Sequence, residues 1–432
     1  MRKLIVLLLS ILPFIGYSQR IITEDITNFW NAYDKIVLEK DSLNQLELIK
    51  TAYIDKGTPG LNGIMQARRY SAEEYIYAIN HYPKFWQSVR NNTLKSTQFS
   101  KEIEDGVKKL KDIYPALKPV NIYFEIGILR TGGTTIDEMV LIGSEVALTD
   151  KSVITSEFDN RYPHLRDYFN TNPINNVVFL NIHEYIHTQQ KETIGNTLLS
   201  QTMMEGVAEF LAEIALSKKS PNPQIDFGYK NEERIKSEYE KEMFSPNIYN
   251  WIMNNPNNQF GMRDLGYFVG YAICKKYYEL STDKMLAVKE MIELDYNNET
   301  ALINFVEKTK YFGQPLSVYK AEFEKKRPIV TAIQQFKNGS KNVNPDIKTF
   351  TISFSEEMNP NFRNFELGPL GESNLLRIKK IIGFSEDNKS FTFEANLEPD
   401  KQYQILINYG FRSKNQYLLV PYLIDFKTAK NP

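Results

Sequence analysis

Two of the chain's four histidines stand four residues apart, in the stretch Asn-Ile-His-Glu-Tyr-Ile-His at residues 181–187. On a helix, side chains at positions i and i+4 lie one above the other, so the imidazoles of His183 and His187 would face one point. Glu184 follows the first histidine and would lean toward the same space. Two imidazoles beside a carboxylate are typical of a zinc site, in which the ion acidifies a water and the carboxylate takes its proton.

A chance match of this pattern on an ordinary amphipathic helix is the alternative interpretation. The six residues before His183, VVFLNI at 177–182, are mostly apolar and predict a buried helix. Buried imidazole and carboxylate groups need partners, and a metal ion would provide one. We therefore interpret the pattern as a metal site.

A catalytic zinc takes three protein ligands and leaves a fourth position to water. The stretch MMEGVAEF at 203–210 offers two glutamates one helical turn apart, Glu205 and Glu209. We predict Glu205 as the third ligand, on a helix antiparallel to the first, and Glu209 as the partner of a ligating histidine's outer nitrogen. The reverse assignment, with Glu209 on the metal and Glu205 in support, stays open.

The combination of HEYIH with a later EGVAEF resembles the gluzincin metallopeptidases, in which an HExxH helix is followed by a second helix with a glutamate ligand. The resemblance implies that His183, His187 and Glu205 hold one zinc ion per chain, with Glu184 as general base. Glu209 falls where these families place an acid that supports the first histidine.

The resemblance extends beyond the two ligand motifs. The segments FWNAYDK, GGTT, IGSE and GYFVGYAI are similar to a family of secreted bacterial proteins that are predicted zinc-dependent proteases. Together with the ligand motifs, these segments cover most of residues 25–280. A zincin-like domain is therefore expected there.

A hydrolase of this kind also needs a group that donates to the developing oxyanion. No histidine follows His187, so imidazole is excluded downstream. Tyr267 and Tyr271 lie four residues apart on one predicted helical face, and either hydroxyl could donate; the alternative is that both are packing residues of an aromatic helix. His81 and His164 precede the motif and are interpreted as surface or packing residues.

Helical periodicity dominates residues 21–120, where Ser71 and Glu74 form a capping box at one predicted helix start. Residues 121–129 and 139–148 have the character of strands on either side of a glycine-rich loop. The first part of the chain is therefore expected to be mostly helical with a small sheet.

Helices are predicted again from residue 173 to about 326, with Cys274 on the apolar side of one of them. Zincins carry a substrate-binding edge strand just before the active-site helix, and 139–148 could be that strand, holding an extended peptide through main-chain hydrogen bonds. A plain core strand is the equal alternative, because a short apolar run does not reveal its position in a sheet.

Beyond Arg327 the pattern changes to short β-rich runs separated by polar turns, which suggests a small β-sandwich. ISFSEEMNP, the turn at 397–403 and the closing DFKTA resemble bacterial Ig-like domains. The resemblance implies an accessory spacer, or a module that contacts a surface or a carbohydrate.

The expected fold class is therefore α+β, with two domains after an N-terminal leader. The predicted ranges are 1–18 for a signal peptide, 19–327 for a mostly helical zincin-like metallopeptidase domain (helical part 19–120, catalytic core 121–326) and 328–432 for an Ig-like β-sandwich.

The N-terminus has the layout of a secretory signal peptide. Arg2 and Lys3 precede a short apolar run, and Gly16 and Ser18 are small residues before a cut after residue 18. The run is short for a membrane span, although an uncleaved anchor is the alternative. We expect an exported protein, periplasmic or secreted, with no stable membrane insertion after cleavage.

Charge and cysteine content limit the remaining classes. The formal net charge of −1 gives no reason to expect a nucleic-acid partner. Cys274 is the only cysteine, so no intramolecular disulfide can form. An exported chain of this kind must be stabilised by packing and by any metal that it binds.

These features predict an exported zinc hydrolase that acts on peptide or protein substrates. One alternative is a binding or adhesion protein with a zincin domain that has lost activity, although the presence of Glu184 argues against it. The other is a zinc hydrolase of a non-peptide amide or ester, because activated water attacks any suitably held carbonyl.

Overall fold

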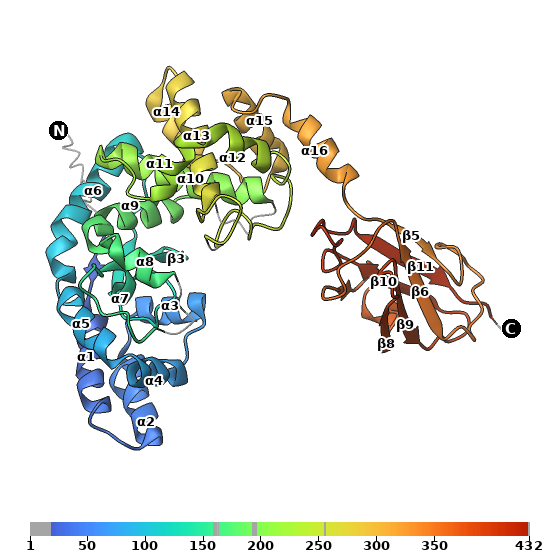
Figure 1. The fold of residues 1–432 in the computed structure, drawn as a ribbon, viewed down its shortest axis with the longest axis horizontal. Coiled ribbons are helices and arrows are strands. Elements are labelled where there is room, and N and C mark those ends of the chain that lie inside the picture. Colours follow the sequence, from blue (N-terminus) through green and yellow to red (C-terminus); the bar gives the residue numbers. More distant parts are fainter. Residues whose placement is uncertain (1–18, 159–161, 163, 192–196, 255, 431–432) are drawn as a thin grey trace, which may run out of the picture. The chain divides into compact units, whose positions relative to one another are not determined.

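The computed structural model describes residues 19–158, 162, 164–191, 197–254 and 256–430. The predicted signal peptide, residues 1–18, lies outside them. The chain is α+β and falls into two compact units, Met1–Lys236 with Ile248–Tyr311, and Ser237–Asn247 with Phe312–Pro432. Figure 1 shows the helices of the first unit in blue to yellow and the strands of the second in orange to red.

The first unit begins with the predicted helical segment. Its helices are α1 (Glu24–Ile36), α2 (Ser42–Ala52), α3 (Pro59–Arg68), α4 (Ala72–His81), α5 (Pro83–Thr93) and α6 (Ser100–Ile113), with 3-10 turns η1 (Ile54–Lys56) and η2 (Ser96–Phe99). The capping box at α4 is present, because Ser71 accepts from the Glu74 amide and the Glu74 carboxylate accepts from the Ser71 amide. Phe29, Trp30 and Trp86 form part of an aromatic core, with ring centroids about 5 to 6 Å apart.

A small sheet of four strands lies in the first unit, in the order β1-β2-β4-β3. Its strands are β1 (Ile21–Ile22), β2 (Asn121–Glu125), β3 (Thr134–Ile136) and β4 (Met139–Gly143). β4 pairs with β2 in parallel and with β3 in antiparallel orientation. Of the two alternatives for 139–148, the structure selects the inner strand: β4 is flanked on both sides, and the chain turns into α7 (Ser144–Ala147). The edge strands of this sheet are β1 and β3.

The remaining helices of this part of the chain follow the sheet. They are α8 (Leu165–Asn170), α9 (Val177–His187), α10 (Leu198–Leu216), α11 (Pro223–Lys230), α12 (Glu232–Tyr239), α13 (Leu265–Leu280), α14 (Lys284–Ile292) and α15 (Glu299–Thr309), with η3 (Pro173–Asn176) before α9. Thr197 caps α10 by accepting from the Ser200 amide. Cys274 is fully buried on α13, as its apolar setting predicted.

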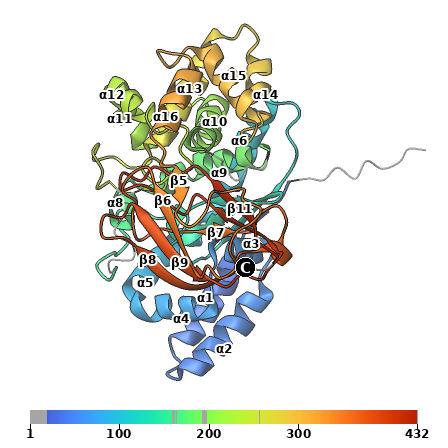
Figure 2. The ribbon, with the colours of Figure 1, turned by 90° about the vertical axis from the view of Figure 1, so that its right-hand side faces the viewer.

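The second unit holds α16 (Leu316–Lys325) and seven strands. They are β5 (Val330–Ile333), β6 (Thr349–Phe354), β7 (Phe365–Glu366), β8 (Ile378–Phe384), β9 (Ser390–Ala395), β10 (Gln402–Ile407) and β11 (Tyr422–Lys427), with η4 (Glu372–Asn374). The sheet orders are β5-β6-β9-β8 and β11-β10-β7, with antiparallel pairing throughout. Figure 2 shows β6, β9 and β8 side by side. Alternate residues of β9, including Phe391 and Phe393, are fully buried in one apolar core.

The predicted domain boundary near 327 lies just after α16. In the structure the second unit already begins at Phe312, so it includes α16, and it also includes residues 237–247. Within that unit the Tyr319 hydroxyl on α16 donates to Glu240 Oε1 at 3.0 Å. Among the described residues, no helix has the length and apolarity needed to cross a membrane.

Candidate metal centre

Helix α9 presents both motif histidines to one point. The Nε2 atoms of His183 and His187 lie 3.0 Å apart, and the two rings are nearly perpendicular. The helix can lie deep in the unit because α6 offers a glycine to it: a Cβ on Gly106 would stand 3.0 Å from Ile182 Cδ1. His183 and Ile182 are buried, and His187 is the last residue of the helix.

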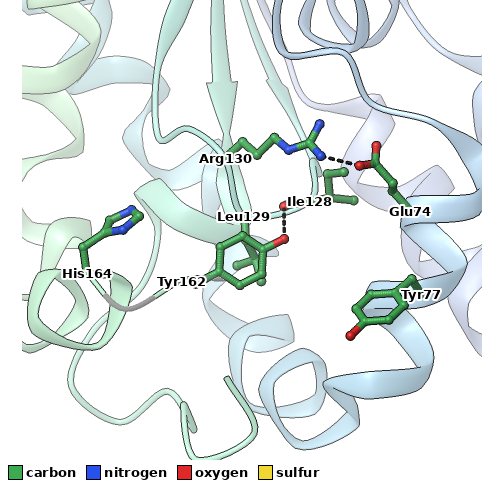
Figure 3. A pocket seen from close by; sticks show the side chains of 7 residues that line it. All are labelled: Glu74, Tyr77, Ile128, Leu129, Arg130, Tyr162 and His164. Carbon is green, nitrogen blue, oxygen red and sulfur yellow. Dashed lines mark hydrogen bonds and ion pairs between the residues drawn. The ribbon is translucent and has the colours of Figure 1, made fainter. Parts of the chain in front are cut away.

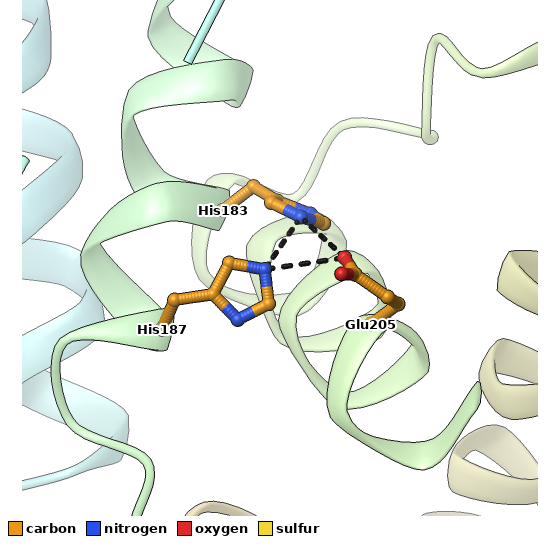
Figure 4. Close-up of side chains that lie close together, drawn as sticks. All are labelled: His183, His187 and Glu205. Atoms are coloured by element: carbon orange, nitrogen blue, oxygen red, sulfur yellow. Dashed lines mark hydrogen bonds and ion pairs between the residues drawn. The ribbon is translucent and has the colours of Figure 1, made fainter. Parts of the chain in front are cut away.

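Glu205 on α10 completes a cluster of three potential ligands. Its Oε2 lies 3.4 Å from His183 Nε2 and 3.2 Å from His187 Nε2 (Figure 4). Ligand atoms at about 2.0–2.1 Å from a tetrahedral zinc ion would stand about 3.3 Å from one another. The three separations therefore fit a single ion of that size, with two nitrogens and one carboxylate oxygen as donors.

Glu209 occupies the position behind His183. Its fully buried carboxylate has Oε2 at 3.1 Å from His183 Nδ1, a close charged contact that lacks regular hydrogen-bond geometry. Ser220 Oγ donates to Glu209 Oε1, and Asn222 Nδ2 donates to Oε2 at 2.8 Å. Of the two assignments that the sequence left open, the geometry brings Glu205 to the cluster and Glu209 to the outer nitrogen.

Gln190 plays the corresponding part for His187, and the sequence analysis missed it. His187 Nδ1 lies 2.7 Å from Gln190 Oε1, while Gln190 Nε2 donates to the Met204 carbonyl and to the Tyr296 hydroxyl. Because the amide nitrogen donates to a carbonyl, the amide oxygen must face the imidazole. Nδ1 then carries the proton, and Nε2 keeps a lone pair for an ion. An amide one turn after the second histidine was the available signal.

Two glycines set how closely α13 approaches the ligand helix α10. A Cβ on Gly206 would stand 2.2 Å from the Gly270 carbonyl carbon, and a Cβ on Gly270 would stand 2.0 Å from the Thr202 carbonyl oxygen. The two helices therefore touch backbone to backbone. This close contact explains why a glycine, Gly206, directly follows Glu205 inside the helix, although glycine lowers the stability of a helix.

The two candidate tyrosines of α13 have different surroundings. The Tyr267 ring lies over His183, with centroids 6.1 Å apart and planes 17° apart, and burial and the Glu205 carboxylate raise the pKa of Tyr267. The Tyr271 hydroxyl instead donates to Glu213 Oε1 at 2.8 Å. Only Tyr267 is thus directed to the cluster.

Glu184 lies against the glycine-rich loop that precedes β3. A Cβ on Gly133 would stand 2.8 Å from Glu184 Oε1, so the carboxylate reaches a position that only a glycine leaves free. The Glu184 side chain is buried, and burial raises its pKa. The edge strand β3 starts at the next residue, Thr134, so the carboxylate lies at the end of the sheet edge.

The cluster as a whole attracts positive charge. Burial lowers the pKa of His183, but its contacts with the carboxylates of Glu205 and Glu209 outweigh burial and raise it to about 10. Burial also lowers the pKa of His187, but the Glu205 carboxylate outweighs burial and raises it. Such a cluster takes up protons, and a divalent cation would displace them on binding.

A separate cavity of about 360 Å³ lies in the same unit and includes none of the cluster residues (Figure 3). It is lined by Glu74, Tyr77, Ile128, Leu129, Arg130, Tyr162 and His164. Two nitrogens of the Arg130 guanidinium are engaged there: Nη2 pairs with Glu74, and Nη1 donates to the carbonyls of Arg68 and Arg69 at 2.9 Å each.

Neither upstream histidine joins the cluster. His164 lines the cavity, where burial lowers its pKa. His81 is exposed and stacks on Tyr77, with ring centroids 3.8 Å apart.

No family model and no curated protein matches the chain. Solved structures that it resembles include the surface layer protein SbsC, domains 1–6, at 15% identity over 62% of this chain, with a TM-score of 0.19. The chain covers only 37% of that protein's length. The N-terminal part of the bacterial S-layer protein SbsC is 12% identical over 94% of this chain and 77% of that chain, with a TM-score of 0.18. Similarities at this level carry no argument about fold or function.

Proposed function

We propose that this protein is a zinc-dependent hydrolase that cleaves peptide bonds. The observation that supports the proposal most directly is the convergence of His183, His187 and Glu205 from two helices, with Glu184 beside them. The donor set and its spacing suit zinc, and the hydrogen bond from His187 to Gln190 leaves the correct nitrogen lone pair free.

The residues divide the work between binding and proton transfer. When bound, zinc supplies the Lewis acidity that makes water a nucleophile near neutral pH. Glu184 takes the proton of the attacking water and delivers it to the leaving amine, a role that a raised carboxylate pKa favours. Tyr267, whose hydroxyl is directed to the Glu205 carboxylate in the cluster, would donate to the developing oxyanion, whereas the Tyr271 hydroxyl is held by Glu213.

The sheet edge supports a peptide as the substrate. In the described part of the chain β3 pairs only with β4, and its three residues are partly exposed. An extended peptide laid along this edge would form main-chain hydrogen bonds. Its scissile bond would then pass near Gly133, where the Glu184 carboxylate lies.

The proposal also covers the domain type of each unit and the place of the protein outside the cytoplasm. The first unit would be a gluzincin-type domain and the second an Ig-like sandwich, supported by two antiparallel sheets that share one apolar core. The second unit would act as a spacer or contact a surface or carbohydrate. The protein would be exported through its predicted signal peptide, to the periplasm or the medium.

Metal analysis and a peptide-library cleavage assay test the proposal together. Wild-type protein should contain about one zinc per chain and cleave peptides. Glu184→Gln should keep the metal and lose hydrolysis, and His187→Ala should lose both. Protein that stays metal-free at saturating zinc would contradict the metal site. Bound zinc without cleavage by wild type would favour a binding protein.

A further inference from the structure

Arg68, the last residue of α3, carries a charge that the described part of the chain leaves without a carboxylate partner. Its Nε is buried and has no hydrogen-bond partner, and no ion pair of the guanidinium occurs among the described residues. Arg130 nearby is the opposite case, since Glu74 and two carbonyls satisfy it. A buried N–H without an acceptor is costly, and a carboxylate ligand could supply one.

Two sets of contacts place the end of α3, which Arg68 occupies, near the glycine-rich loop. α3 packs across the sheet, where a Cβ on Gly60 would stand 2.3 Å from Tyr123 Cβ of β2 and one on Gly63 would stand 3.0 Å from Ile136 Cγ2 of β3. Arg130 donates to the Arg68 carbonyl and so ties the end of α3 to the glycine-rich loop. The third residue after Arg130 is Gly133, which lies against the Glu184 carboxylate.

The charge of Arg68 is a minor influence on two nearby groups. Burial raises the pKa of Glu184 and of Tyr70, and the positive charge of Arg68 partly offsets that rise in both. Tyr267, by contrast, stacks on His183 and is influenced by Glu205, on the side of the metal ligands. Arg68 is therefore placed to meet a part of the substrate that lies beyond Glu184, and Tyr267 to meet the reacting carbonyl.

We propose that Arg68 determines specificity by binding a carboxylate of the substrate, so that the preferred substrates are peptides with an anionic group near the cleaved bond. The inference rests on the proposed hydrolase function. A guanidinium forms two parallel hydrogen bonds to a carboxylate, which supplies both affinity and orientation. The carboxylate can be the C-terminal one or that of an aspartate or glutamate side chain.

A matched set of peptides tests the proposal and distinguishes the two sources. One peptide library carries a free C-terminal carboxylate and no acidic side chains, the second is the same library amidated, and the third is amidated with one aspartate or glutamate added. Wild-type protein should cleave the first or the third library with a kcat/KM about 10- to 100-fold above the second, the range for a charged hydrogen bond.

Arg68→Gln should remove that preference, so that kcat/KM on the carboxylate-bearing libraries falls to its value on the amidated library, because the preference comes from one charged contact. Arg68→Lys should restore part of it. Arg69→Gln is the matched control, since Arg69 is exposed, and it should keep the full preference. Equal losses on all three libraries in Arg68→Gln would mean that Arg68 only adjusts Glu184, and would overturn the inference.

Binding measurements separate this inference from the hydrolase proposal. In the Glu184→Gln background, the three libraries are titrated onto zinc-loaded protein with and without Arg68→Gln, and thermal unfolding confirms that both variants are folded. A carboxylate preference that disappears with Arg68→Gln supports the inference even if wild type cleaves nothing. If Glu184→Gln protein that retains Arg68 shows no preference for a carboxylate, the inference is refuted, even if wild type cleaves peptides.

Discussion

The cores of the two units differ in what they bury. Every charged side chain that is buried among the described residues belongs to the first unit; they are Asp25, Glu125, Glu145, His183, Glu184, Glu205 and Glu209. The buried polar residues of the second unit are uncharged, and its core is aliphatic and aromatic. Burying charge lowers stability unless it is compensated, so it is retained where chemistry requires it. The comparison supports the proposal that the reactive site lies in the first unit.

The largest expected effect on stability tests the structural side of this comparison. Phe393 is fully buried and stacks on Phe350, with ring centroids 5.3 Å apart. Phe393→Ala should lower the free energy of unfolding of the second unit by about 3–5 kcal/mol, because it leaves a cavity. Calorimetry should show this loss while zinc content and hydrolysis stay unchanged. A loss of zinc in this variant would contradict the separation of roles.

The next effect concerns a buried carboxyl group away from the proposed metal site. Glu145 accepts from the amides of Gly127 and Leu129, at a turn where Leu129 has a φ of +66°, yet burial raises its pKa to about 7. The folded protein then binds a proton that the unfolded chain has released between about pH 4.5 and pH 7. Stability should fall as pH rises through that window, by roughly 3 kcal/mol in total, and stay level above it.

Denaturant unfolding of wild type and Glu145→Gln at several pH values checks this. The variant loses one acceptor and will be less stable throughout, so the slope with pH is the informative quantity. Wild type should lose stability between about pH 4.5 and 7 more steeply than the variant. Parallel curves would show that Glu145 keeps an ordinary pKa in the fold.

A smaller effect should follow from separating α10 and α13. Gly206→Ala places a Cβ 2.2 Å from the Gly270 carbonyl carbon, so the helices must move apart. We expect a loss of about 1–3 kcal/mol and weaker zinc binding, because Glu205 is the preceding residue. Gly132→Ala is the control, since its nearest contact would be an ordinary 3.5 Å. Unchanged zinc affinity in Gly206→Ala would show that the crossing does not position the ligand.

The smallest effect concerns the partner of His187. Gln190→Ala removes the acceptor for His187 Nδ1 and should weaken zinc binding about 10- to 100-fold with little change in fold. Competition with a zinc chelator measures it. Gln189→Ala is the neighbouring control, because Gln189 bonds to Lys118 rather than to the histidine. Equal zinc affinities of the two variants would show that Gln190 does not support the proposed zinc ligand His187.

Local patterns were predictable because their physics is local. The capping box at Ser71, the helix that presents His183 and His187, and most strands of the second unit follow from residue spacing alone. The assignment of an inner or an edge strand at 139–148 did not, because strand order depends on which segments pair across the sheet.

The sequence by itself determined that two imidazoles would share one helical face with a carboxylate next to them, since a period of 3.6 residues requires no further contact. Only the tertiary structure decided between Glu205 and Glu209, which stand one turn apart on one helix, and between Tyr267 and Tyr271. Those choices depend on how helices dock, through the contact of Gly206 with Gly270. Docking is set by side chains distant in sequence, and no local period encodes it.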